Sequence, residues 1–161
     1  MADTSAKEEV RFDSVEILSK AKTQAESRVK LVRALLEDKE IKDEEYRRIQ
    51  SLYDDARAEV NSGLDRLLVE LETTGSQGKE EPYDRLARRA ADRTTEFLKI
   101  SDKVIFGNDR GLVESGVDLA GKLVDALVDV WKTLHGEKTQ RHALLLKRIE
   151  SLKWREFADV K

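Results

Sequence analysis

The chain has 161 residues, enough for one domain with a single core, and charged residues make up 39% of it. It contains one proline and no cysteine, which favours long helices and excludes disulfides, thiolate catalysis and thiolate metal sites. Its 30 basic and 33 acidic residues are mixed along the sequence, so the chain has no global positive field to attract nucleic acid.

The first twelve residues are polar and charged, and we expect them to be flexible. They lack the basic start and the apolar stretch of a secretory signal. No run of about 18 uncharged apolar residues occurs, so the sequence predicts no free-standing membrane span. Together with the absence of cysteine, these features favour a cytoplasmic protein.

Two long helices are predicted in the first half of the chain, from about Asp13 to Asp38 and from Asp43 to about Leu71. Their apolar residues recur three and four positions apart, so each helix presents one apolar face. In the first helix these residues are Val15, Leu18, Ala21, Ala25, Val29, Val32 and Leu36. Because only a short polar turn joins the two helices, we expect residues 13–73 to form an antiparallel, coiled-coil-like hairpin.

A loop is predicted over residues 74–82, followed by a third helix. Pro82 suits the first turn of that helix, and Gly107 suits the left-handed conformation that ends one. The predicted buried stripe consists of Tyr83, Leu86, Ala90, Thr94, Phe97, Ser101 and Val104.

The fourth predicted helix, residues 112–135, has an unusually wide apolar face. Its charged residues fall within a stripe of roughly 80°: Glu114, Asp118, Lys122, Asp125, Asp129 and Lys132. Three interpretations remain open. The helix could be central and touch several neighbours, it could keep part of its face open for another copy or a partner, or it could enter a membrane after a conformational change.

The last predicted helix follows a polar stretch around Gly136 and is expected to end near Ala158. The apolar spacing continues across Gly136 without a phase break, so the chain either breaks there or runs on as one helix, and we favour the break. Trp154 and Phe157 lie off the apolar stripe of the last helix. They either anchor an interface or fold back against the bundle.

Groups that could perform catalysis lack the arrangement that the chemistry requires. Paired carboxylates such as Asp54 and Asp55 lie in highly charged stretches that we expect to be solvated, whereas acid/base catalysis needs carboxylates held apart from water. His135 and His142 do not have the spacing of a helical metal site. We therefore expect a protein that is not an enzyme, with no catalytic residue, cofactor, metal or small-molecule substrate.

A cluster of arginines on the third helix is the one basic feature that could grip phosphates. Acidic residues are interleaved with it, which favours ion pairs over nucleic-acid binding. The cluster consists of Arg85, Arg88, Arg89 and Arg93.

The sequence thus predicts a single all-α domain over residues 1–161, an antiparallel bundle of four to five helices whose C-terminal helices span 83–158. We expect a non-enzymatic interaction module that self-associates or binds a protein partner through its apolar C-terminal half. The alternative is a membrane-active helical effector, pore-forming or membrane-disrupting, that exposes helix 112–135. The candidate interface residues are Leu119, Leu123, Val130, Trp131, Trp154 and Phe157.

Overall fold

A computed structural model describes residues 13–72, 80–107, 112–134 and 140–161 of the chain, without the side chains of 69–72, 80, 112–120 and 140–143. Within these residues the chain forms helices and one 3-10 turn, and no strand. They are α2 (Asp13–Glu37), α3 (Asp43–Glu72), α4 (Glu80–Phe106), α5 (Leu112–Leu134), α6 (Gln140–Leu152) and η1 (Phe157–Asp159). The predicted all-helical bundle is confirmed. The expectations for residues 1–12 and for most of the loop predicted at 74–82 lie outside the described residues. The last three residues of that predicted loop are helical, because α4 begins at Glu80.

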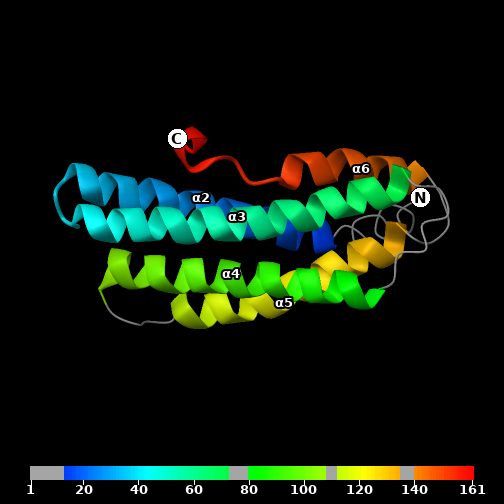
Figure 1. The fold of residues 1–161 in the computed structure, drawn as a ribbon, viewed down its shortest axis with the longest axis horizontal. Coiled ribbons are helices and arrows are strands. Elements are labelled where there is room, and N and C mark those ends of the chain that lie inside the picture. Colours follow the sequence, from blue (N-terminus) through cyan, green and yellow to red (C-terminus); the bar gives the residue numbers. More distant parts are fainter. Residues whose placement is uncertain (1–12, 73–79, 108–111, 135–139) are drawn as a thin grey trace, which may run out of the picture.

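The helices lie in layers on the two sides of the α2–α3 pair (Figure 1). Helices α4 and α5 pack against each other on one side, with α5 mainly against α2 and α4 mainly against α3. Helix α6 and the residues after it lie on the other side, where α6 contacts both α2 and α3. The α2–α3 pair is therefore covered on both of its broad faces.

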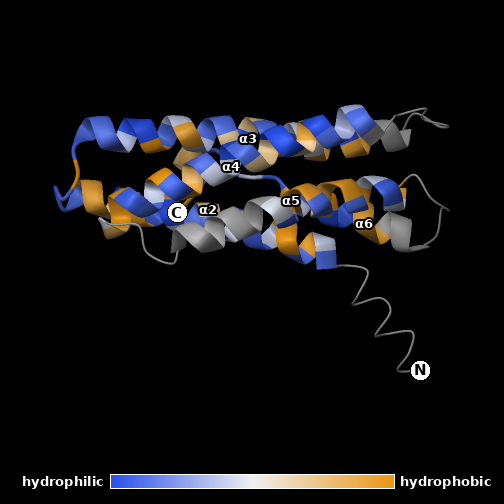
Figure 2. Cartoon of the chain, turned by 90° about the horizontal axis from the view of Figure 1, so that it is seen from below, coloured by the Kyte–Doolittle hydropathy of each residue, from blue (hydrophilic) through white to orange (hydrophobic). Residues whose placement is uncertain are grey.

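The predicted apolar stripes form the core of the bundle. Figure 2 shows α3 with hydrophilic residues along its outer side and hydrophobic residues toward its neighbours. Most residues of the predicted α2 stripe are buried, and Leu36 is half-buried. In α4, the buried members of the predicted stripe are Tyr83, Ala90, Thr94, Phe97 and Ser101. Spacing of three and four residues therefore located the inner face of each helix correctly.

One buried ion pair joins α2 to α4 within this core. Arg28 Nε donates to Asp102 Oδ1 at 2.8 Å, and Arg28 Nη2 donates to Asp102 Oδ2 at 3.2 Å. Arg28 Nη1 also donates to the carbonyl oxygen of Gln24 at 3.1 Å. Because the guanidinium and the carboxylate meet edge to edge, each charge is neutralised and hydrogen-bonded where water is excluded.

The turn between α2 and α3 contains a strained residue. Lys39 has φ of 60°, the left-handed region that glycine adopts most easily. The N–H of Lys39 donates to Leu36 O at 3.0 Å, and the N–H of Glu40 donates to Leu35 O at 2.8 Å. This pair of bonds is a Schellman motif that ends α2, with Lys39 in the position usually held by glycine.

Replacing Lys39 with glycine is expected to raise the free energy of unfolding by about 0.5–1 kcal/mol, because glycine enters this conformation without a Cβ clash. Urea denaturation would measure the change. Glu40→Gly is the matched control, since Glu40 has a negative φ and gains nothing from glycine. A loss of stability in the Lys39 variant would contradict this account of the turn.

The C-terminal part departs from the prediction at one point. Helix α5 is described to Leu134 and α6 from Gln140, on the other side of the α2–α3 pair, while the predicted break near Gly136 lies outside the described residues. The expectation that the last helix ends near Ala158 is wrong, because α6 ends at Leu152. The N–H of Trp154 donates to Asn61 Oδ1 at 2.8 Å instead of to a helical carbonyl, and the backbone at Glu156 is extended.

Helix α5 packs against α4, α2 and α3 and has one charged side. Its buried apolar residues are Leu123, Ala126, Leu127, Val130, Trp131 and Leu134. The charged residues at positions 122, 125, 129 and 132 are exposed. Among the helices that the structure describes, none combines the length and the hydropathy needed to cross a membrane.

Candidate interaction site

The predicted interface residues fall into two separate groups. Leu123, Val130 and Trp131 belong to the buried side of α5, where the Trp131 ring stacks on Tyr83 with centroids 6.2 Å apart. The side chain of Leu119 lies outside the described residues. In the folded monomer, the described members of this group pack inside the bundle and are not open to a partner.

Trp154 and Phe157 form the second group, in the stretch that follows α6. We call residues 153–160 the C-terminal segment. Three of its apolar side chains, spaced three residues apart, are almost fully buried: Trp154 is 2% exposed, Phe157 5% and Val160 1%. The residues between them are exposed at positions 155, 156, 158 and 159. The segment therefore anchors three side chains and leaves the intervening ones in solvent.

The anchors lie against aromatic residues of α3. Tyr53 is the centre of the contact, with its ring centroid 5.4 Å from Trp154 and 5.7 Å from Phe157. Tyr46 meets Phe157 edge-on at 5.5 Å. Tyr53 also touches Phe97 of α4, at 5.4 Å. The Tyr53 ring thus connects the segment to the core between α3 and α4, and such ring pairs add stabilisation beyond their buried area.

Side chains of α3 hold the main chain of the segment. Asn61 accepts from the N–H of Trp154 at 2.8 Å and donates through Nδ2 to the carbonyl oxygen of Trp154 at 3.0 Å. Arg57 Nε donates to the same oxygen at 3.1 Å. The Tyr53 hydroxyl donates to the carbonyl oxygen of Arg155 at 2.5 Å. These bonds recognise peptide groups and do not depend on which side chains the segment carries.

Helix α2 completes this set of contacts through Arg33. Its guanidinium donates through Nη2 to the carbonyl oxygen of Phe157 at 2.8 Å and through Nη1 to that of Val160. It also lies over the Phe157 ring, 5.4 Å from the centroid. The segment is therefore held from both helices, in what we call the α2–α3 groove, lined by Arg33, Tyr46, Tyr53, Arg57 and Asn61.

Charges along the edge of the groove complement those of the segment. Lys153 Nζ lies 2.5 Å from Asp65 Oδ1 of α3, and Arg155 Nε lies 3.7 Å from Glu26 Oε2 of α2. The hydrogen bond to Asp65 raises the pKa of Lys153. Two cations that flank Trp154 in the sequence thus meet one carboxylate on each helix.

Tyr53 gives the groove a dependence on alkaline pH. Burial, followed by the negative charge of Glu26, raises the pKa of its hydroxyl above the ordinary value of 10.0. As pH rises, the unfolded chain releases this proton first, so the free energy of unfolding falls from about pH 10 upward. Below that pH the stabilisation that comes from the protonated Tyr53 hydroxyl is fully present.

We expect Tyr53→Phe to flatten the stability curve above about pH 10, relative to the unmodified chain. At neutral pH the free energy of unfolding of the same variant should be about 1 kcal/mol lower than that of the unmodified chain, because the hydrogen bond to the Arg155 carbonyl oxygen is absent. Urea denaturation between about pH 8 and 11.5 would give both values. Parallel pH profiles for the two proteins would show that Tyr53 is not the group that titrates.

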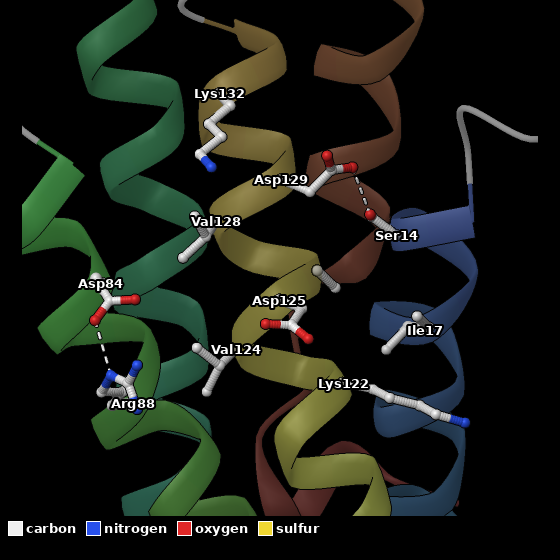
Figure 3. Close-up of a pocket in the computed structure, with 11 residues that line it drawn as sticks. Ser14, Ile17, Asp84, Arg88, Lys122, Val124, Asp125, Val128, Asp129 and Lys132 are labelled. Atoms are coloured by element: carbon white, nitrogen blue, oxygen red, sulfur yellow. Dashed lines mark hydrogen bonds and ion pairs between the residues drawn. The ribbon is translucent and has the colours of Figure 1, made fainter.

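A second, shallow groove of about 590 Å³ lies along the outer side of α5 (Figure 3). Its apolar residues are Ile17, Val124, Ala126 and Val128. Around them, Ser14 Oγ donates to Asp129 Oδ2 at 2.7 Å, and Arg88 Nε pairs with Asp84 Oδ2 at 2.8 Å. Because carboxylates and cations mix along this groove, it does not select a ligand of one charge.

Three of the four arginines in the predicted cluster of α4 form ion pairs within the chain. Arg88 pairs with Asp84, Arg89 with Glu59 at 3.4 Å, and Arg93 with Glu96 at 3.7 Å. This is the role that the interleaved acidic residues predicted. Exposed pairs of this kind contribute little to stability.

The residues that bind the main chain of the segment were absent from the sequence-based candidates. Arg57 and Asn61 follow the buried Tyr53 at spacings of four residues, so the three side chains form one ridge along α3. The two polar residues in line with a buried tyrosine are the signal in the sequence. Arg33 carries no comparable signal, because its acceptors lie 124 and 127 residues away.

The fold and the site define a class: an all-helical bundle with a groove between two helices, occupied by a segment of the same chain. Comparisons of the chain with protein-family models, with curated proteins and with solved structures found no match. In the part of the chain that the structure describes, no three His, Asp or Glu side chains gather as a metal site would require. The α2–α3 groove is the feature from which a function can be inferred.

Proposed function

We propose that this chain is a non-enzymatic protein-interaction module and that the α2–α3 groove and the C-terminal segment form its interaction site. The observation that carries the proposal is the recognition of the segment through its main chain. Asn61 binds both the N–H and the carbonyl oxygen of Trp154, as a neighbouring strand would.

Recognition of an extended peptide commonly divides into two parts. Bonds to the main chain supply affinity, and pockets for spaced side chains supply specificity. The α2–α3 groove has both parts, because five side-chain donor bonds reach main-chain carbonyls and three apolar anchors are buried at a fixed spacing. A segment in which anchors follow the pattern of Trp154, Phe157 and Val160 is the ligand that this geometry fits.

The proposal shifts the interacting surface that the sequence suggested. Leu123, Val130 and Trp131 are buried in the monomer and serve the core of the bundle. Trp154 and Phe157 remain in the proposed site. They belong to the C-terminal segment, which occupies the α2–α3 groove of its own chain. Association therefore uses the C-terminal half through its last residues and not through α5.

The test uses the full chain with its own segment displaced. In Trp154→Ala the first anchor is lost, and a fluorescent peptide of residues 150–161 is added in trans. We expect the variant to bind this peptide at least tenfold more tightly than the unmodified chain, whose tethered segment competes at high effective concentration. A peptide with alanine at positions 154, 157 and 160 is the matched control and should not bind.

Circular dichroism would establish that the variant is folded before the titration. If Trp154→Ala does not fold, Val160→Ala opens only the last pocket and takes its place. A folded variant that ignores the peptide would contradict the proposed interaction site. Adding Asn61→Ala to the variant should weaken peptide binding, since both bonds to residue 154 disappear.

The second proposal, a membrane-active effector, has its support in α5 alone. That helix has a buried apolar side and an exposed charged side, which is the amphipathic pattern of helices that insert into a membrane interface. Insertion would require α5 to leave α2 and α4. Leakage of dye-loaded liposomes under acidic and neutral conditions tests it, and intact liposomes under every condition would oppose it.

A further inference from the structure

We infer that the α2–α3 groove accepts the C-terminal segment of a second copy of this chain, so that two chains associate by exchanging residues 153–160. This inference rests on the proposed interaction site and names its partner. It is carried by three observations: where the segment makes its contacts, how it is joined to α6, and which charges accompany its anchors.

Apart from the bond from the N–H of Lys153 to Glu150 of α6, the hydrogen bonds that join the described segment to other elements end on α2 or α3. The donors or acceptors are Arg33, Tyr53, Arg57 and Asn61. The ring contacts of Trp154 and Phe157 are to Tyr46 and Tyr53 of α3. One α2–α3 pair therefore contains the complete receptor, and a segment that arrives from another chain finds every contact in one molecule.

Few main-chain hydrogen bonds connect the segment to α6. Beyond Leu152, the N–H of Lys153 reaches the carbonyl oxygen of Glu150 at 3.4 Å, and the main chain of Trp154 is bonded only by groove side chains. The bonds inside the segment are confined to η1, from Asp159 to Glu156 and from Val160 to Phe157. When the groove releases it, the segment can pivot at Lys153 while η1 stays intact.

Charge complementarity favours this chain's own sequence as the occupant. A segment must bring a cation before the first anchor, for Asp65, and one after it, for Glu26. Lys153 and Arg155 supply both. A second copy carries the same anchors and the same cations, so exchange restores each contact without requiring a new interface.

Covalent crosslinking tests the exchange. Because the chain contains no cysteine, each introduced cysteine is the single thiol that can react. Two single-cysteine variants, Asp65→Cys and Lys153→Cys, carry tags of different mass and are mixed with a short bis-maleimide. The two side chains touch within one chain, so a linked heterodimer of the two variants forms faster than random collisions allow only when the segment of one chain occupies the groove of the other. We expect this heterodimer to accumulate with time and protein concentration.

The matched control replaces Asp65→Cys with Asp92→Cys, an exposed position on α4, and should give only the slow background of random collisions. A second measurement uses no covalent crosslinking. Asp65→Lys and Lys153→Asp each place like charges together within the chain, and only exchange between the two variants pairs opposite charges. The mixture should associate roughly tenfold more tightly than either variant alone, and added salt should abolish the difference.

Crosslinking no faster than the Asp92→Cys control, together with a charge-reversed mixture that stays monomeric, would overturn the exchange. Peptide binding separates this failure from failure of the proposed function. If the peptide of residues 150–161 still binds the opened groove, the interaction site stands and its partner is another protein. If the peptide does not bind either, the groove serves only the fold.

Discussion

Replacing Asp102 with alanine is expected to lower the free energy of unfolding by about 3–5 kcal/mol. The carboxylate side chain is 3% exposed and accepts two bonds from Arg28. Its removal leaves a guanidinium without its counter-charge between α2 and α4, where water cannot replace the lost partner. Urea or guanidinium denaturation followed by circular dichroism would measure the change.

Two comparisons make this prediction specific to the ion pair. Asp92→Ala removes an exposed carboxylate from the same helix and should change stability by no more than about 0.5 kcal/mol. The double replacement Arg28→Met with Asp102→Leu removes both charges together and should recover most of the loss. A double variant as unstable as the single one would show that volume, and not unpaired charge, is responsible.

Replacing Trp154 with alanine is expected to lower the free energy of unfolding by about 3 kcal/mol and the thermal midpoint by roughly 6–12 °C. The indole is buried against Tyr53, and alanine leaves that pocket empty. Phe157 and Val160 are then the remaining anchors of the segment, and the stretch that joins them to α6 no longer has the contact of the Trp154 ring. Thermal denaturation followed by circular dichroism would give the midpoint.

Arg155→Ala is the control for the Trp154 variant. It changes the neighbouring residue but keeps the carbonyl oxygen that accepts from Tyr53. It removes a 3.7 Å pair between an exposed guanidinium and the half-buried Glu26. Its expected effect is below about 1 kcal/mol. Equal effects of the two replacements would mean that the side chain of Trp154 does not anchor the segment.

The positions of the helices were predictable because helix periodicity is a local property. Residues three and four apart share a face wherever the helix lies, so the inner faces of α2, α3 and α4 could be read from spacing alone.

The end of α6 was not predictable in the same way, because it is set by residues far along the chain. Asn61 and Arg57 take the main-chain groups of Trp154, across 93 and 97 residues. The sequence did carry a hint, since Trp154 and Phe157 fall off the apolar stripe of α6. A helix that continued would have pointed Trp154 away from the bundle, and the chain buries it by ending the helix.

The wide apolar face of α5 shows a second limit of periodicity. Spacing reports how much of a helix is apolar but not how many neighbours cover it. In the structure α4, α2 and α3 all contact α5, so Leu123, Val130 and Trp131 are buried without a partner chain. A central helix and an interface helix have the same pattern, and only the placement of the other helices separates them.

The distance in sequence between the groove and its occupant has a consequence during synthesis. Tyr53 precedes the carbonyl oxygen of Arg155 that it binds by 102 residues. At translation rates of about 5–20 residues per second, the ribosome needs roughly 5–20 s to make that stretch. For this time the α2–α3 groove of the nascent hairpin has no segment to cover its tyrosine rings, and exposed aromatic surface is of the kind that chaperones bind. Nascent chains should therefore bind such chaperones until Trp154 and the anchors after it emerge from the exit tunnel.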